Sequence, residues 1–219
     1  MSALYYCRQT TTACKGIPYP SKTHPYRYGT AGCVYTSGCG VCASLMALRN
    51  STTRVFNTRQ WTHRCLGMGA RAAEGTDMAV VARHMKEKYG LDYAITTDMD
   101  RLVAHLKQGY KAIINVSGGG KMLFSNSGHY VLAAGIDKNG NLIILDPYWY
   151  DGKFTLTAAR RKYTRVKNGR EVYVRPADLK GDVLSLWLFT PKRDVRLAYS
   201  THDIHYRLSL IHISEPTRP

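Results

Sequence analysis

The sequence predicts an α+β fold, in which helices come first along the chain and antiparallel strands follow. Apolar residues recur at the helical spacing i, i+4, i+7 over residues 40–48. Two later segments, 76–89 and 97–109, begin at Thr and meet a glycine at their end, as helices commonly do. Beyond residue 110 the pattern changes to apolar runs of strand length. With 219 residues, 44% of them hydrophobic, the chain can bury a substantial core, which predicts one domain with a tail.

The helices are expected in the first half of the chain. Residues 1–36 are rich in Tyr, Thr, Pro and Gly and predict irregular chain. The first helix, over Gly40–Leu48, carries three apolar residues on one face. Thr76 is the expected N-cap of the second helix and Gly90 its stop. A short strand then leads to the third helix, within residues 97–109.

The strands are expected in the second half. Residues 111–119 predict a strand that ends in a glycine-rich loop. The stretch HYVLAAGIDKNGNLIILDPY contains two apolar runs joined through Asn139-Gly140, a strong hairpin signal. A turn at these two residues pairs positions near 134 and 145. The segments REVYVRP and VLSLWLF complete an antiparallel sheet.

The charge of the chain indicates its possible partners. A formal net charge of +16 attracts polyanions, such as nucleic acid, anionic lipid or an anionic cell-envelope polymer, although a scattered basic surface also keeps a protein soluble. No RNA-binding signature, zinc finger or sustained basic helix accompanies it, so we do not expect nucleic-acid binding. No apolar run is long enough for a transmembrane helix. The first residues lack the pattern of a secretory signal, so we expect cytoplasmic synthesis with release by lysis or a dedicated route.

Cys39 stands between two glycines in SGCGVCASLMALRN, immediately before the first expected helix. At a helix N-terminus the macrodipole and the free backbone N–H groups stabilise a thiolate. The same N–H groups, with that of Gly40 among them, could hold the oxyanion formed when the thiolate attacks a carbonyl. The flanking glycines would let a substrate carbonyl approach the backbone closely. The pattern therefore indicates a nucleophilic cysteine.

A nucleophilic cysteine needs a base, and His129 is the candidate among the eight histidines. It begins an apolar strand directly after the loop SGGGKMLFSNSG. The partner strand of the hairpin ends at Asp146, so both side chains are expected at the open end of the hairpin. We therefore predict a triad of Cys39 as nucleophile, His129 as base and Asp146 as the orienting carboxylate.

These residues resemble the C39-like branch of the papain-fold cysteine peptidases. The shared pattern is a GCG-type cysteine that opens a helix, a Gly-His that starts a strand and an Asp-Pro that ends the next strand. The resemblance covers roughly residues 5–191. It implies a papain-like fold, with the nucleophile at the N-terminus of a helix packed on the antiparallel sheet. It also implies hydrolysis of peptide or amide bonds through a thioester, in a bacterial or phage protein, without a cofactor.

Two features depart from that family. Its members usually carry a glutamine upstream of the nucleophile that completes the oxyanion hole, and Gln9 is the upstream candidate here. Cys42 occupies a position where the family often has a small or hydroxyl residue. Cys39 and Cys42 also form a C-x-x-C, which leaves open a redox pair or, with Cys33 and Cys65, a zinc site. The spacing fits no common zinc finger, so no metal site is predicted.

The expected function is that of a cysteine peptidase or amidase acting on a peptide substrate. One alternative is an endolysin-like endopeptidase or amidase, whose basic surface would concentrate it on peptidoglycan and the anionic cell envelope. The other is a catalytically degenerate papain-like domain that binds peptides without cleaving them.

The expected boundaries are a peptidase domain over residues 1–191 and a tail over 192–207. Residues 208–219, LSLIHISEPTRP, resemble translated sequencing-adapter read-through, and we exclude them from fold and function. The natural C-terminus would then be missing, and a targeting domain could have followed.

Overall fold

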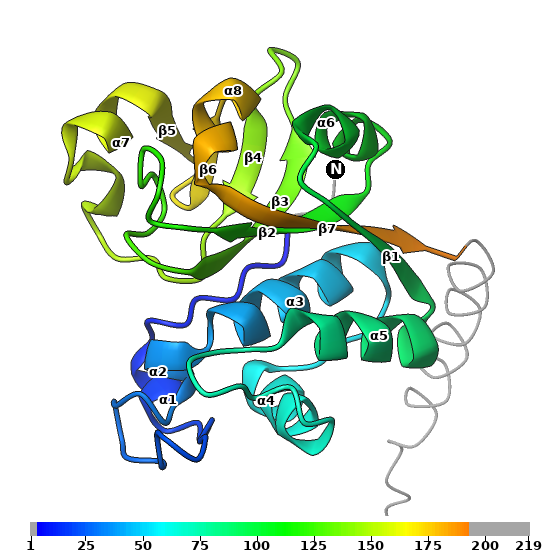
Figure 1. Ribbon diagram of the computed structural model, residues 1–219, viewed down its shortest axis with the longest axis vertical. Coiled ribbons are helices and arrows are strands. Elements are labelled where there is room, and N and C mark those ends of the chain that lie inside the picture. Colours follow the sequence, from blue (N-terminus) through cyan, green and yellow to red (C-terminus); the bar gives the residue numbers. More distant parts are fainter. Residues whose placement is uncertain (1–3, 193–219) are drawn as a thin grey trace, which may run out of the picture.

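A seven-stranded antiparallel sheet organises the structure, and helices cover both of its faces (Figure 1). The computed structural model describes residues 4–192. Within that range the strands lie in the order β1-β7-β2-β3-β4-β6-β5. The elements are α1 (Thr12–Lys15), α2 (Val34–Ser37), α3 (Cys39–Ser51), α4 (Thr58–Gly67), α5 (Met78–Tyr89), β1 (Leu91–Thr96), α6 (Met99–Lys107), β2 (Lys111–Val116), β3 (His129–Ile136), β4 (Leu142–Leu145), η1 (Lys153–Thr155), α7 (Ala158–Tyr163), β5 (Thr164–Lys167), β6 (Glu171–Val174), α8 (Pro176–Leu179), η2 (Lys180–Asp182) and β7 (Val183–Pro191). The predicted α+β class is confirmed.

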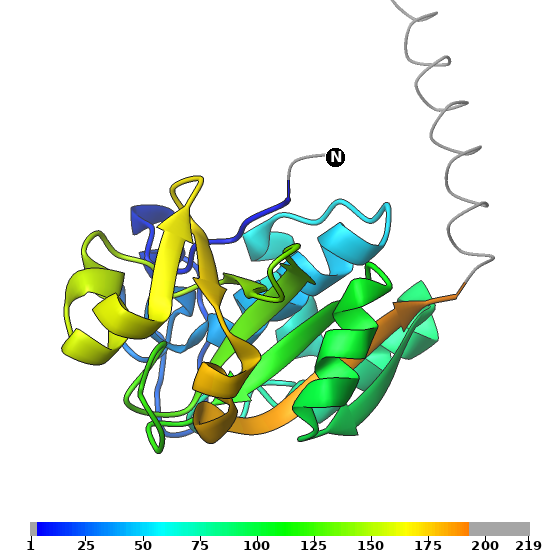
Figure 2. The same cartoon turned by 90° about the horizontal axis from the view of Figure 1, so that it is seen from above.

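The sheet separates two hydrophobic cores. Successive strand residues point to opposite faces, and β2 shows this alternation: Ile113 joins the core that contains α3, α4 and α5, whereas Ile114 joins the core that contains α6. In Figure 1 α3, α4 and α5 lie below the sheet and α6 lies above it. Seen from above, the hairpin of β5 and β6, which forms one edge of the sheet, and the adjacent α7 lie on the opposite side of the molecule from α6 (Figure 2). None of the described helices is both long and apolar enough to cross a membrane.

Helix α3 is the central helix of the lower layer. It packs on β2 and β3 on one side and on α4 on the other, and every residue from Gly40 to Leu48 is buried. A helix buried on all sides needs apolar residues around its circumference, and the segment VCASLMAL supplies them. Asn50, in its last turn, exchanges hydrogen bonds with the backbone of Tyr5. The N-terminal segment is thereby tied to the end of α3.

The other two expected helices are present, with one correction to their caps. Asp77 caps α5 and Asp98 caps α6, each through its side chain. Thr76 does not cap α5, because its hydroxyl is hydrogen bonded to that of Tyr19 at 2.9 Å. Gly90 ends α5 with a φ of 63°, the left-handed conformation that favours glycine. Helix α4 was missed, although the pair Asn57 and Gln60 forms a capping box that marks its start.

The β3–β4 hairpin forms as expected, but the predicted pairing of residues near 134 and 145 is wrong by two positions, because Leu132 pairs with Leu145. Two features cause the difference. The loop has three residues rather than two, since Asp137 pairs with Asn141. A bulge between Ala133 and Gly135 then shifts the register once more. Strand β6 lies within the predicted segment REVYVRP, whereas α7 and β5, which precede it, were not predicted.

Residues 193–219 lie outside the described residues. The expected tail and the segment 208–219 therefore remain predictions, as does the domain boundary at 191. Strand β7, which ends at Pro191, lies in the sheet between β1 and β2.

Candidate active site

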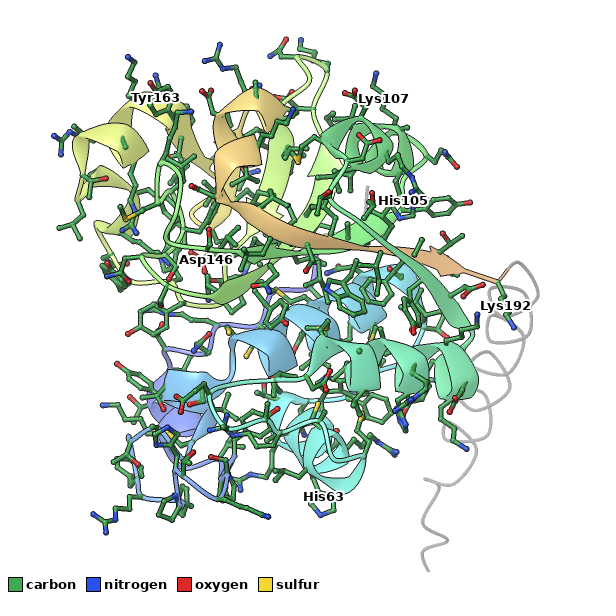
Figure 3. All side chains as sticks on the ribbon, in the orientation of Figure 1. His63, His105, Lys107, Asp146, Tyr163 and Lys192 are labelled. Carbon is green, nitrogen blue, oxygen red and sulfur yellow. The ribbon has the colours of Figure 1, made fainter. Side chains whose placement is uncertain are left out.

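Three candidate residues from separate parts of the chain meet where α3 packs against the sheet. Cys39 is the first residue of α3, His129 is the first residue of β3, and Asp146 directly follows β4. The antiparallel pairing of β3 with β4 brings the second and third together, and the packing of α3 on β3 adds the first. Figure 3 shows Asp146 between the sheet and the helical layer below it, whereas His63 and His105 lie elsewhere, at α4 and near α6.

His129 lies between the other two side chains. Its Nε2 is 2.7 Å from Asp146 Oδ1, and its interaction with the Cys39 thiol lowers the pKa of that thiol. Since Nε2 is engaged by the carboxylate, Nδ1 is the nitrogen left for the thiol. His129 is 6% exposed and Asp146 is 0% exposed, whereas Cys39 is partly exposed. A reactant could therefore reach the sulfur while the base and the carboxylate stay shielded from water.

The two reacting groups shift each other's protonation. Burial opposes ionisation of the Cys39 thiol, but the hydrogen bond and charge of His129, with the N–H groups of Tyr130 and Gly40, outweigh it and lower the pKa of the thiol. Burial likewise opposes the imidazolium, but Asp146 and the Cys39 sulfur raise the pKa of His129 to about 9. The environment therefore favours a thiolate–imidazolium pair.

The Asp146 carboxylate is held by donors on both of its oxygens. Oδ1 accepts from His129 and from the backbone N–H of Tyr148 at 2.9 Å, and Oδ2 accepts from Lys153 Nζ at 2.5 Å. Burial opposes its ionisation, but His129 and Lys153 together lower the pKa of Asp146. Lys153 carried no signal in the sequence, because a lysine seven positions after Asp146 in an aromatic loop looks like any surface lysine.

The two candidate donors to the oxyanion, Gly40 and Gln9, lie in different parts of the structure. The N–H of Gly40 lies against the Cys39 sulfur, as expected for the first turn of α3. Gln9 is 1% exposed, its backbone N–H donates to Pro147 O at 2.9 Å, and its Nε2 donates to Tyr35 O at 3.2 Å. Gln9 thus lies between α2 and the residue that follows Asp146. Its Oε1 has no hydrogen-bond partner among the described residues.

The sequence suggested that Gly38 and Gly40 leave room for a substrate carbonyl. In the structure, other parts of the protein occupy the space where their side chains would be. A Cβ on Gly38 would lie 2.4 Å from the carbonyl oxygen of Val34, and a Cβ on Gly40 would lie 2.5 Å from the Cβ of Thr76. Both glycines are buried. They are therefore required by close packing inside the protein, which fixes the position of the α3 N-terminus.

The remaining cysteines do not join the site. All six cysteines are free thiols. Cys42 is 0% exposed and points to Cys7, whose hydrogen bond, with burial, raises the pKa of Cys42 well above its ordinary value. Residues 4–192 contain no group of His, Cys, Asp or Glu side chains that could hold a metal ion, so the zinc alternative with Cys33 and Cys65 finds no site there.

A family of peptidases matches most of the chain. The model of the Peptidase_C39 like family covers residues 14–172, a range that includes Cys39, His129 and Asp146 and begins after Gln9. The sequence has no significant match among curated proteins.

The solved structures that are similar to the chain include two peptidase domains. One is the peptidase domain of Streptococcus ComA, a bifunctional ABC transporter involved in a quorum sensing pathway, with a TM-score of 0.47 and 14% identity over 70% of this chain and 91% of that chain. The other is the peptidase domain of Streptococcus mutans ComA in complex with a small-molecule inhibitor, with a TM-score of 0.40 and 15% identity over 71% of this chain and 93% of that chain.

Proposed function

Because the chain belongs to the Peptidase C39-like family, we propose that it is a cysteine peptidase that hydrolyses peptide or amide bonds through Cys39, His129 and Asp146. The observation that carries this proposal is the position of His129. Its imidazole lies 2.7 Å from the Asp146 carboxylate, and its interaction with Cys39 lowers the pKa of the thiol and raises that of the imidazole. A nucleophile, a base and an orienting acid in that order can perform acyl transfer.

The first half of the reaction forms a thioester. In the resting site the thiol proton is on His129, so Cys39 is a thiolate. The sulfur attacks the scissile carbonyl carbon, and the electron pair of the C=O bond moves to oxygen. When the tetrahedral intermediate collapses, the C–N bond breaks and the imidazolium gives its proton to the leaving amine. Asp146 keeps the ring oriented throughout.

The second half regenerates the enzyme. Neutral His129 takes a proton from a water molecule, whose oxygen attacks the thioester carbon. The S–C bond breaks, the acid product leaves, and the thiolate–imidazolium pair is restored. In both halves the N–H groups at the start of α3, including that of Gly40, and the amide of Gln9 are the candidate donors to the oxyanion.

Alkylation by iodoacetamide tests the pair without knowledge of the substrate. We expect Cys39 to react at pH values well below the ordinary thiol pKa of about 8.5. The reaction should become slower when His129→Ala removes the imidazolium. Mass spectrometry identifies the labelled cysteine. Cys39→Ala provides the background from the five buried thiols.

The opposite result has a defined meaning. If Cys39 is alkylated only as fast as an ordinary thiol, and His129→Ala does not change that rate, the thiolate–imidazolium pair does not form. The chain would then be a degenerate domain that binds peptides without cleaving them. Once a substrate is found, Cys39→Ala and His129→Ala should each reduce turnover at least about 10³-fold, with unchanged circular dichroism.

A peptidoglycan substrate is a second candidate, favoured by the charge of the surface. Five exposed cations lie on α7 and the β5–β6 hairpin: Arg161, Lys162, Arg165, Lys167 and Arg170. We call these five residues the basic hairpin surface. Such a surface attracts the anionic polymers of a cell envelope. Cleavage of purified wall material by the wild-type chain, but not by Cys39→Ala, would assign this substrate.

A further inference from the structure

Lys153 is a lysine that the fold buries almost completely. It is 2% exposed, and among residues 4–192 it is the one buried lysine. Its Nζ lies 2.5 Å from Asp146 Oδ2 and 2.9 Å from the carbonyl oxygen of Tyr148. The rings of Tyr148, Tyr150 and Phe154 surround it, with centroids 5.4, 5.9 and 5.7 Å from Nζ. Aromatic faces and two oxygen acceptors thus replace the water that an ammonium group would otherwise bind.

Burial of this ammonium group is costly for the fold alone. Removing a cation from water is unfavourable, and an apolar side chain of the same length would fill the space without that cost. The position of the ammonium group instead indicates a role at the Asp146 carboxylate. Lys153 binds the carboxylate oxygen that His129 does not bind, so the two cations share Asp146.

The charges of the site balance only when Lys153 is counted. With the Cys39 thiolate, the His129 imidazolium and the Asp146 carboxylate alone, the site would carry one net negative charge. The ammonium group of Lys153 brings the sum to zero. Asp146 and Lys153 together then present His129 with an oriented acceptor whose negative charge is largely offset.

We propose that Lys153 is a positioning residue that fixes the Asp146 carboxylate and offsets its charge, so that Asp146 orients His129 without holding its proton too tightly. This inference rests on the proposed function, because it concerns the same thiolate–imidazolium pair. The imidazolium must give its proton to the leaving amine, and a proton that is bound more strongly is transferred more slowly. An unbalanced buried carboxylate would bind it more strongly.

Other ionisable groups face the site from the surrounding elements. The hydroxyl of Tyr6 donates to the backbone oxygen of Asp146. The charge of Cys39 shifts the pKa values of Tyr19, Tyr130, Arg71 and Cys42, and the charge of Arg160 lowers the pKa of Lys153. Arg160 donates to the carbonyl oxygens of Met122 and Lys153 and not to a carboxylate. Within the described range, Lys153 is therefore the one ammonium or guanidinium group that contacts the Asp146 carboxylate.

The test is a double-mutant cycle on the titration of His129, read from the NMR signals of its imidazole in the intact chain. Lys153→Met should raise the pKa of His129 by about one unit, because the carboxylate loses its second cation. Asp146→Asn should lower it, because the anion is gone. The double variant, which removes both charges, should titrate between the two single variants and below wild type, because Asp146 contacts the imidazole directly and Lys153 does not. A role in packing alone produces no shifts of opposite sign.

Two variants control the cycle. Lys153→Arg keeps the charge and should keep the pKa of His129 near the wild-type value. Lys86→Met removes an exposed lysine that pairs with Asp92 on the surface, and should leave the titration unchanged. If Lys153→Met fails to fold, Lys153→Gln takes its place, since it is also uncharged but retains a polar end.

The outcome separates this inference from the proposed function. Iodoacetamide labelling of wild-type Cys39 is measured beside the titration. Fast labelling below pH 8.5 or so, with the same or a lower His129 pKa in Lys153→Met, overturns the role of Lys153 and leaves the peptidase intact. Slow wild-type labelling overturns the peptidase itself.

Discussion

Burial and charge act in opposite directions on Cys39 and His129. Burial alone would favour a neutral thiol and a neutral imidazole. The two groups instead stabilise each other's ionised forms, with Asp146 behind the imidazole and the N–H groups of Tyr130 and Gly40 at the sulfur. We therefore expect the thiolate–imidazolium pair between the lowered pKa of Cys39 and the pKa of about 9 of His129.

This window predicts a bell-shaped dependence of kcat/KM on pH. Below the window the thiolate is protonated, and above it the imidazolium has lost the proton that the leaving amine needs. We therefore expect the alkaline limb near the His129 pKa of about 9. Initial rates on a cleaved peptide from pH 5 or so to pH 10 or so would locate both limbs. An alkaline limb below neutral pH would contradict the assignment of His129.

Gln9 can be tested by comparing two reactions of the same thiol. Amide hydrolysis forms an oxyanion, whereas alkylation by iodoacetamide does not. If the Gln9 amide binds the oxyanion, Gln9→Ala should lower kcat about 10²-fold and leave the alkylation rate of Cys39 unchanged. Loss of both reactions would instead assign Gln9 to the support of α2 and the Pro147 segment, which its side chain and backbone contact.

At the scale of elements, the N-terminus of α3 is fixed by contacts that only glycine allows. Gly38 packs on the Val34 carbonyl in α2, and Gly40 packs on the side chain of Thr76, just before α5. Thr76 is itself held by Tyr19. The first turn of α3 is therefore positioned by two neighbouring segments as well as by the sheet.

Gly40→Ala should shift this turn. Its Cβ would lie 2.5 Å from that of Thr76, closer than real Cβ atoms come. We expect a loss of about 1–3 kcal/mol in the free energy of unfolding, measured in urea, because the packed site has no room to relax. In a Thr76→Gly background, which removes the clashing Cβ, Gly40→Ala should cost much less than it does in the wild-type chain.

A matched glycine provides the control for this substitution. Gly67 ends α4, is exposed, and has nothing within 4 Å of its would-be Cβ. Gly67→Ala should leave stability unchanged or raise it slightly, since alanine favours a helix. An equal loss at both positions would show that the clash with Thr76 is not the cause.

At the scale of the molecule, the net charge of +16 is distributed over several faces, and the basic hairpin surface is one concentration of it. In Figure 1 α7 and α5 lie on opposite sides of the molecule. Charges on these two elements can therefore be reversed separately, with the same change in net charge.

Binding to purified cell-wall material should depend on the basic hairpin surface and weaken as salt rises, because exposed charges are screened. The variant Lys162→Glu/Lys167→Glu should bind more weakly than Arg83→Glu/Lys88→Glu, which reverses two exposed cations on α5. Sedimentation with the wall measures both. Equal binding by the two variants would mean that net charge alone, and not this surface, attracts the polymer.

The sequence by itself determined that helices precede strands, the helix that starts at Cys39, and the identities of Cys39, His129 and Asp146 as candidates, although it missed α4, α7 and β5. These features have local signals: apolar periodicity, Asp and Thr before helices, glycines after them, and a hairpin turn between two apolar runs. The local signals also placed His129 and Asp146 at the same end of the hairpin. The triad remains a prediction until the labelling experiment is made.

Only the tertiary structure decided which contacts these residues make. The hairpin register depends on a bulge at Ala134 and a loop one residue longer than expected, and neither leaves a distinct local pattern. Glycine is required at positions 38 and 40 because Val34 and Thr76 pack against them. The burial of Lys153 depends on how the loop after β4 folds, because Asp146, Tyr148, Tyr150 and Phe154 enclose its Nζ only in the folded chain.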